Sequence, residues 1–221
     1  MDIGRRRFVK YLVGLGIVVG ASGLLINNLV KTAKNSVSNL LPPGQYQVFN
    51  MPVLNEGSIP FPDKTTWNLE VYGLVDKPLN LNYVEFRRIP TVVSVSDFHC
   101  VTGWSKLGNM WEGVRFRDIM NMAGSQATAT YATFECENGF TTQLMVEDLS
   151  KDDVLLAYRL EKSELSTEHG GPLRLVVPEK YAYKSAKWVR KIKFTDKLEL
   201  GFWEINGYSN TADPWKNDRY Y

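Results

Sequence analysis

The feature that most constrains the fold is the order in which short strand-like and helix-like segments follow one another. Trp67–Val71 alternates apolar and polar residues, as a strand with one buried face does. Tyr131–Glu137 and Phe140–Leu144 flank Asn138-Gly139, a dipeptide typical of a tight β-hairpin. The pattern predicts about eight to ten short strands and three or four short helices, which do not alternate as βαβα. This order argues against a doubly wound parallel sheet and predicts one α+β domain with mixed β-sheets and short helices.

Three helical segments and five further strands complete this prediction. Asn82 and Glu85 have capping-box spacing and predict a short helix that ends near Arg88. A turn is expected at Gly113, followed by a helix from Arg115 or Phe116 that ends at Gly124. A helical turn is expected at Val146–Ser150, and the further strands at Leu79–Leu81, Thr91–Ser96, Val154–Leu160, Leu173–Val177 and Trp188–Phe194.

The composition is that of a globular protein with nearly balanced charge. The chain has 221 residues, of which 44% are apolar, and its 26 basic and 24 acidic residues leave a formal net charge of +2. A general nucleic-acid binder would present a strongly basic face, so no nucleic-acid partner is expected. The 2 cysteines exclude both a disulfide framework and a four-cysteine zinc site.

The N-terminus combines a basic cluster with an apolar run. Arg5, Arg6 and Arg7 precede Tyr11–Val30, and twenty helical residues span about 30 Å, the thickness of a bilayer core. Arginines followed by Phe8-Val9-Lys10 resemble a twin-arginine export signal, and an ordinary signal anchor with basic flanking residues is the alternative. Both a cleaved signal and a retained membrane anchor fit this pattern, so we expect an exported protein, in the periplasm or on the outer face of the cytoplasmic membrane.

The chain therefore divides into three parts. Residues 1–33 are predicted to be the twin-arginine-like signal or anchor helix. Residues 34–50, which include Pro42-Pro43-Gly44, are interpreted as a linker, and residues 51–221 as the folded domain. The twin-arginine route exports folded proteins, so it suits a domain that takes up a cofactor before export.

Two groups of residues are candidates for chemistry. Cys100 follows a predicted strand and lies in a turn-rich segment, where a thiolate can react or bind a metal; a half-buried structural cysteine is the alternative. Later in the chain, Gly170 and Gly171 lie near Arg174 and other cations, a pattern that suits a bound anion such as phosphate. A solvated basic face would show the same charge pattern. No nucleotide-binding glycine loop, nucleophile elbow or paired-histidine zinc motif occurs.

Several motifs in one order resemble the sulfite oxidase family of molybdopterin oxidoreductases, and its small single-domain members most closely. The matching segments are Phe98-His-Cys-Val-Thr-Gly-Trp-Ser, Asn109-x-Trp-Glu-Gly-Val, Gly171-Pro-Leu-Arg-Leu-Val-Val-Pro, Lys184-Ser-Ala-Lys-Trp and Gly201-Phe-Trp-Glu-x-x-Gly-Tyr. The resemblance covers residues 51–221. It implies the sulfite-oxidase molybdopterin-binding domain fold and the molybdenum cofactor, Mo-molybdopterin.

The resemblance also implies roles for individual residues. Cys100 matches the cysteine that ligates molybdenum at the catalytic centre, a soft donor for such a metal. The residues matching those that hold the pterin and its phosphate are Asn55, Glu56, His169, Arg174, Ser185, Ala186 and Lys187. Glu56 is a departure, since the eukaryotic sulfite oxidases have histidine there.

A second departure concerns the substrate. The sulfite oxidases carry a sulfite-binding arginine five residues after the cysteine, where this chain has Ser105, so Trp104 and Ser105 are expected to shape the pocket instead. The expected function is oxygen-atom transfer to or from a small substrate such as a sulfur compound or sulfoxide. The chain has no Cys-x-x-Cys-His haem motif, so electrons are expected to pass to or from an external carrier, such as a cytochrome or a haem membrane subunit.

Two other interpretations remain open at this level. One is a cofactor-free, membrane-anchored binding domain of the same fold, and the other is a thiol redox protein that uses Cys100 directly. A disulfide between Cys100 and Cys136 would remove the proposed metal ligand, so Cys136 is interpreted as a structural or neighbouring cysteine.

Overall fold

The computed structural model describes residues 41–221, which form one compact unit. The signal or anchor helix predicted for residues 1–33 lies outside the described residues. Within residues 41–221 no helix is long and apolar enough to span a bilayer.

The described chain consists mainly of strands with short helices between them. The strands are β1 (Tyr46–Gln47), β2 (Asn68–Gly73), β3 (Leu79–Asn82), β4 (Val92–His99), β5 (Trp104–Arg115), β6 (Tyr131–Cys136), β7 (Thr141–Met145), β8 (Leu155–Leu160), β9 (Ser163–Glu164), β10 (Arg174–Val176) and β11 (Val189–Thr195). The α-helices are α3 (Tyr83–Phe86), α4 (Phe116–Ala123), α5 (Val146–Leu149) and α6 (Phe202–Ile205), and 3₁₀ turns occur at η1 (Thr167–His169), η2 (Ala182–Lys184) and η3 (Pro214–Lys216).

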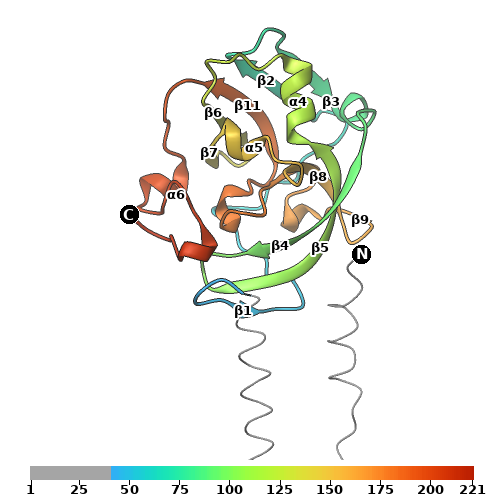
Figure 1. The fold of residues 1–221 in the computed structure, drawn as a ribbon. Coiled ribbons are helices and arrows are strands. Elements are labelled where there is room, and N and C mark those ends of the chain that lie inside the picture. Colours follow the sequence, from blue (N-terminus) through green and yellow to red (C-terminus); the bar gives the residue numbers. More distant parts are fainter. Residues whose placement is uncertain (1–40) are drawn as a thin grey trace, which may run out of the picture. The chain divides into compact units, whose positions relative to one another are not determined.

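These strands form two sheets. The five-stranded sheet has the order β3-β2-β11-β6-β7, and its β11–β2 pair is parallel. The other sheet has six strands, with β1-β5-β8-β10 hydrogen-bonded in that order, β4 on β5 and β9 on β8. Figure 1 shows the long β4–β5 ribbon passing below the strands β2, β6, β7 and β11. The architecture is therefore an α+β domain with mixed sheets, as predicted.

The main hydrophobic core joins residues of both sheets and of α4. Leu69 and Ile192 of the five-stranded sheet, Leu156 and Leu175 of the six-stranded sheet and Phe116 of α4 belong to one buried cluster. A second, smaller cluster contains Phe98, Cys100, Trp104 and Trp111. Cys100 thus lies against its own apolar cluster, apart from the main core.

The predicted capping box, helix end and hairpin are confirmed, and each depends on only a few neighbouring residues. Asn82 and Glu85 form a reciprocal capping box at the start of α3, and α4 ends at Gly124 in the left-handed conformation with φ of 64°. The Asn138-Gly139 turn joins β6 and β7 as an antiparallel hairpin.

The cysteines are both free, so the Cys100–Cys136 disulfide does not form.

The turn predicted at Gly113 is wrong, because this residue lies inside β5, a strand of 12 residues. Gly113 suggested a turn because glycine is common in turns. At Gly113 the neighbouring strand comes so close that a Cβ atom would lie 2.2 Å from the carbonyl oxygen of Leu156. Glycine is present there to allow β5 and β8 to approach at a β-bulge, and not to turn the chain.

Residues 41–50, assigned to the linker from the sequence, belong to the compact unit. Leu41 is buried, and Tyr46 and Gln47 pair in parallel with Trp104 and Ser105 at the start of β5. The strand β4 also extends to His99, beyond the end predicted at Ser96. Both differences bring more chain to the segment that carries Cys100.

Candidate functional site

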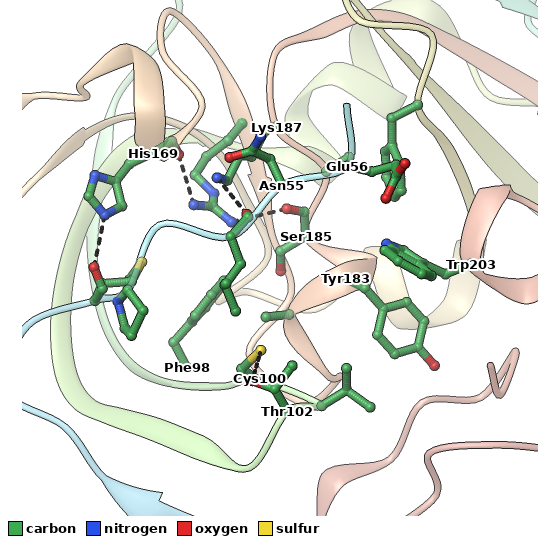
Figure 2. A pocket seen from close by; sticks show the side chains of 18 of the residues that line it. Asn55, Glu56, Phe98, Cys100, Thr102, His169, Tyr183, Ser185, Lys187 and Trp203 are labelled. Carbon is green, nitrogen blue, oxygen red and sulfur yellow. Dashed lines mark hydrogen bonds between the residues drawn. The ribbon is translucent and has the colours of Figure 1, made fainter. Parts of the chain in front are cut away.

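A cavity of about 300 Å³ lies at the segment that contains Cys100. Its lining includes every residue that the sequence resemblance assigned to the site, namely Asn55, Glu56, Cys100, His169, Arg174, Ser185, Ala186 and Lys187. In the view of Figure 2, Cys100 and Thr102 lie at one end, and His169, Lys187 and Ser185 lie toward the other. The fold thus brings together residues that are up to 132 positions apart (Asn55 to Lys187).

Cys100 occupies the first position of the loop between β4 and β5. Its side chain lies in contact with the second apolar cluster and the residue is 8% exposed. The Cys100 Sγ atom lies 3.2 Å from the hydroxyl oxygen of Thr102. Thr102 was not identified from the sequence, although it belongs to the same motif.

Arg174 is a buried cation that contacts no carboxylate among the described residues. Its guanidinium donates hydrogen bonds to the carbonyl oxygens of His169 at 2.8 Å and Ser185 at 3.0 Å. The guanidinium carbon also lies 5.0 Å from the ring centre of Phe98. Burial without a compensating anion lowers the pKa of Arg174 from 12.5 to about 9. Such a group is suited to an anion supplied by a ligand.

Lys187 is a second cation in the same part of the cavity. Its ammonium donates to the carbonyl oxygens of Leu54 at 2.9 Å and Glu168 at 2.6 Å. Desolvation, followed by repulsion from the nearby Arg174, lowers the pKa of Lys187 to about 7. An anion between these two cations would reverse both effects, because it favours the charged form of each.

His169 joins the cation-rich end of the cavity to the extended segment that contains Asn55. Its Nε2 atom donates to the carbonyl oxygen of Met51 at 3.2 Å, and its Nδ1 atom lies 3.0 Å from the hydroxyl of Ser166. Asn55 donates to the carbonyl oxygen of Gly57 at 3.0 Å. The segment Met51–Glu56 contributes most of its residues to the lining and forms one wall of the cavity.

The segment Ser185–Lys187 forms the wall beside Arg174. The hydroxyl of Ser185 accepts a hydrogen bond of 3.0 Å from the backbone N–H of Val177. The carbonyl oxygen of Ala186 accepts one of 2.8 Å from Leu175. These bonds fix the segment against β10, so Arg174 and Lys187 are held on a well-ordered framework.

Aromatic side chains complete the lining, and most of them were not assigned a role from the sequence. They are Phe98, Trp104, Phe140, Tyr183, Trp188, Trp203 and Tyr208. Tyr208 packs between Tyr183, edge-on at 5.4 Å between ring centres, and Trp203, tilted at 4.9 Å. Trp203 and Tyr208 lie in the aromatic tail from Gly201 onward, which matched the family motif. The motif did not show that these rings line the cavity.

A buried ion pair links two of these aromatic segments. Lys184 and Glu204 are each about 1% exposed or less at the side chain and form a salt bridge. Lys184 also donates to the carbonyl oxygen of Gln143 at 3.0 Å, and Glu204 accepts from the hydroxyl of Thr142 at 2.9 Å. Because Lys184 adjoins Tyr183 and Glu204 adjoins Trp203, the pair holds both rings at the cavity.

Ser105 does not lie in the cavity lining, which contradicts the expectation that it shapes the pocket with Trp104. It is fully buried, and its hydroxyl lies 2.7 Å from Nδ1 of His99. Strand alternation explains the difference, since consecutive residues of β5 face opposite sides and only Trp104 faces the cavity. Cys136 lies in the main core, where burial raises the pKa of its thiol.

The donor set of the cavity fits a cofactor with an anionic group at one end and a metal near a thiolate at the other. Arg174 is buried and Lys187 is partly buried, and the hydrogen-bond partners of both among the described residues are carbonyl oxygens, not carboxylates. Cys100 has a sulfur that contacts only the Thr102 hydroxyl among the described polar groups. Within residues 41–221 no group of three or more His, Cys, Asp or Glu side chains could hold a metal ion. The arrangement suits a metal whose other ligands come from the cofactor.

Comparison with known proteins assigns the chain to a family. The family model "Oxidoreductase molybdopterin binding domain" matches residues 56–203. The oxidoreductase YuiH of Bacillus subtilis is 46% identical over 191 residues, which cover 86% of this chain and 96% of YuiH. The protein-methionine-sulfoxide reductase catalytic subunit MsrP of Campylobacter jejuni is 31% identical over 62% of this chain and 52% of its own length.

A solved structure has a similar fold. The sulfane dehydrogenase SoxCD of Paracoccus pantotrophus matches with a TM-score of 0.58 and 24% identity. The match covers 63% of this chain and 40% of the SoxCD chain. At this identity the likeness concerns the fold alone.

Proposed function

Because the chain belongs to the sulfite oxidase family of oxidoreductase molybdopterin-binding domains, we propose that it is a molybdenum–molybdopterin enzyme. It transfers an oxygen atom to or from a small sulfur-containing substrate. The observation that supports this best is the pair of cations in the same cavity as Cys100, namely the buried Arg174 and the partly buried Lys187. Desolvating two cations without a carboxylate partner costs folding free energy, and a cofactor-free binding domain would gain nothing that offsets this cost.

Different cavity residues would hold different parts of the cofactor. Cys100 is the protein ligand of the metal, because a thiolate is a soft donor. Arg174 and Lys187 bind the phosphate, and the guanidinium of Arg174 matches phosphate oxygens in geometry. Asn55, Glu56 and His169 would hold the pterin from one wall of the cavity, and Ser185 and Ala186 would hold it from the other.

When bound, the cofactor supplies two-electron oxygen-atom transfer. The chain contributes binding, orientation and exclusion of water. Thr102 lies beside the Cys100 sulfur and can donate a hydrogen bond to it, which reduces the charge on the thiolate. Phe98 and Trp104 belong to the same apolar cluster as Cys100 and reduce the access of water to this side of the cavity.

An uncharged sulfur compound, such as a sulfoxide or thioether, is the substrate that the lining favours. The residues that remain available once the phosphate occupies the cations are mainly aromatic, with Tyr183, Trp203 and Tyr208 grouped together. Sulfur makes favourable contacts with aromatic rings, of about 0.3–1.5 kcal/mol each. The name of the relative MsrP points to the same class of substrate.

The electrons must be exchanged with another protein. The relative MsrP is named a catalytic subunit, which implies a second subunit. We expect a cytochrome or a haem membrane subunit in that role for this chain. The membrane location would follow from the N-terminal segment, whose basic cluster and apolar run suit export by the twin-arginine route with or without retention as an anchor. Replacing Arg5 and Arg6 by Lys should leave folded protein in the cytoplasm, and unchanged export would contradict this part of the proposal.

The central experiment measures molybdenum in protein produced in cells with a functional molybdopterin pathway. About one molybdenum atom per chain is expected for the unaltered protein and for Cys136→Ala, and almost none for Cys100→Ala. Cys136 is the matched control because it is the other free cysteine and lies in the main core. Well-folded protein without molybdenum would favour the binding domain, and a metal-free protein that reacts rapidly with disulfides would favour the thiol enzyme.

A further inference from the structure

We infer that Gln45 and Arg219, from the two ends of the folded unit, are positioning residues that hold the Cys100 loop in the geometry the metal requires. The loop consists of Cys100 to Gly103, between β4 and β5. This inference rests on the proposed function, since it concerns the same metal ligand. Neither residue lies within positions 56–203, the part that the family model matches.

Gln45 holds the carbonyl group of the ligand residue itself. Its side-chain Nε2 donates to the Cys100 carbonyl oxygen at 3.0 Å. Its Oε1 accepts from the Ser105 hydroxyl at 3.1 Å, and that hydroxyl lies 2.7 Å from Nδ1 of His99. Because the Ser105 proton is directed to Gln45, the Ser105 oxygen accepts from an Nδ1–H of His99. The result is one directed series of donors, from His99 through Ser105 and Gln45 to the Cys100 carbonyl.

Arg219 holds the next carbonyl group of the loop. Its Nη1 donates to the Val101 carbonyl oxygen. Its Nε donates to the side chain of Asn217 at 2.8 Å, and its guanidinium carbon lies 5.4 Å from the ring centre of Tyr181. The guanidinium is therefore oriented by two other groups before it reaches the loop.

The last carbonyl group of the loop, at Gly103, accepts a 2.8 Å hydrogen bond from the backbone N–H of Tyr46. Gly103 has φ of 108°, a conformation that favours glycine, and a Cβ atom there would lie 3.4 Å from the Gly44 carbonyl oxygen. The carbonyl groups of Cys100, Val101 and Gly103 thus each accept a hydrogen bond from residues 45, 219 or 46. A four-residue loop can make few internal bonds, and here these are the Gly103 N–H to the Cys100 carbonyl, at 3.0 Å, and the contact of the Thr102 hydroxyl with the Cys100 sulfur, at 3.2 Å.

This arrangement matters for a metal ligand because the direction of a thiolate depends on its backbone. Catalytic groups must be held within about 0.5 Å and 10–20° of the productive geometry, and surrounding hydrogen bonds supply that restraint. Gln45 and Arg219 contact the backbone of the ligand loop and do not line the cavity. They act on the metal only through Cys100, which distinguishes them from the residues that bind the cofactor.

The test compares Gln45→Met and Arg219→Met with the matched controls Gln126→Met and Arg117→Met. Gln126 donates to Asp76 and Arg117 pairs with Asp152, both at exposed sites away from the loop. Hydrogen exchange of the peptide that contains residues 98–105 is measured in protein made without cofactor. We expect about fivefold faster exchange for Gln45→Met and about tenfold for Arg219→Met, the changes that correspond to losing one neutral and one charged hydrogen bond.

The second readout is the electron paramagnetic resonance spectrum of the molybdenum-loaded, half-reduced protein. Altered g values are expected in both variants but in neither control, with partial restoration in Arg219→Lys. Exchange at the control rate, or faster exchange with an unaltered spectrum, would overturn the inference. If no chain binds molybdenum, the proposed function fails, while the exchange rates still decide whether Gln45 and Arg219 hold the loop.

Discussion

Comparing Arg174→Met with Lys184→Met tests whether Arg174 serves ligand binding, whereas Lys184 serves stability. Arg174 and Lys184 are both buried cations, but Lys184 pairs with Glu204, and Arg174 has only carbonyl oxygens and aromatic rings around it. In the absence of cofactor, the two substitutions should therefore have different effects on stability. The comparison tests the assignment of Arg174 to the cofactor phosphate.

The magnitude follows from the pKa of Arg174, which burial lowers from 12.5 to about 9. A decrease of this size corresponds to about 5 kcal/mol against the charged form. Because the unfolded chain binds this proton more tightly than the folded chain, the penalty is fully present below pH 9 and disappears as the pH rises toward 12.5. Arg174→Met removes this penalty but also removes the two short hydrogen bonds of the guanidinium, to the carbonyls of His169 and Ser185, worth about 1.5–3 kcal/mol each for a charged donor. The two effects nearly cancel, so the unfolding free energy should change by less than about 2 kcal/mol.

Lys184→Met should instead destabilise the protein by about 3–5 kcal/mol, since it leaves the Glu204 carboxylate buried without its partner. At about 2–4 °C per kcal/mol for a chain of this size, the expected fall in Tm is at least about 6 °C. Inorganic phosphate at about ten times its Kd should stabilise the unaltered cofactor-free protein by about 1.4 kcal/mol, or about 3–6 °C. Arg174→Met should lose this stabilisation at fixed pH and ionic strength, and should contain no molybdenum when produced with the pterin pathway.

Thermal melts of the three proteins, with and without phosphate, provide the measurement. The reasoning would be refuted if Arg174→Met lowered the Tm as much as Lys184→Met and still contained molybdenum. It would also be refuted if phosphate stabilised Arg174→Met as much as the unaltered protein. In either case the guanidinium would be a structural group.

Three further predictions concern other parts of the molecule. Sulfate, which does not titrate near neutral pH, should bind the cofactor-free protein about tenfold more weakly at pH 8 than at pH 6, because the lowered pKa of Lys187, about 7, removes its charge in this range; calorimetry should show no such dependence in Lys187→Arg. Trp203→Ala should raise KM for a sulfoxide more than it lowers kcat, because the ring lines the cavity without touching the Cys100 sulfur; an unchanged KM would remove Trp203 from the substrate site. Gly113→Ala should lower the unfolding free energy by more than about 3 kcal/mol, because its Cβ would lie 2.2 Å from a carbonyl oxygen, whereas Gly108→Ala, in open space with φ of 64°, should cost only about 1–2 kcal/mol in a denaturant titration.

The sequence predicted those parts of the fold whose structure depends on neighbouring residues. The capping box at Asn82 and the Asn138-Gly139 hairpin are determined within four residues, and both are confirmed. The course of β5 was missed because its glycine at position 113 is explained only by the approach of β8, more than 40 residues later. Pairing of β1 with β5 was missed for the same reason, since two residues of a proline-flanked segment carry no strand signal.

For the site, the sequence supplied the residues that bear chemistry and not those that position them. Cys100, Arg174 and Lys187 stood in motifs, and all line one cavity. Gln45 and Arg219 stood in no motif, because a hydrogen bond to a backbone carbonyl requires only a donor at the right place. The prediction that Ser105 shapes the pocket was wrong, because its spacing from Cys100 did not show which side of β5 its side chain faces.

The distribution of charge in the cavity gives a reason for substrate selection that does not depend on Ser105. Among the lining residues that the structure describes, the charged side chains are Arg174, Lys187 and Glu56. Once a cofactor phosphate neutralises the two cations, Glu56 leaves the remaining surface uncharged or negative. An anion such as sulfite would then be repelled by about 1–4 kcal/mol from a carboxylate at contact distance, whereas a sulfoxide would not. Glu56→Gln should therefore improve the use of sulfite relative to a sulfoxide by about tenfold in kcat/KM, and an unchanged ratio would show that charge at this position does not select the substrate.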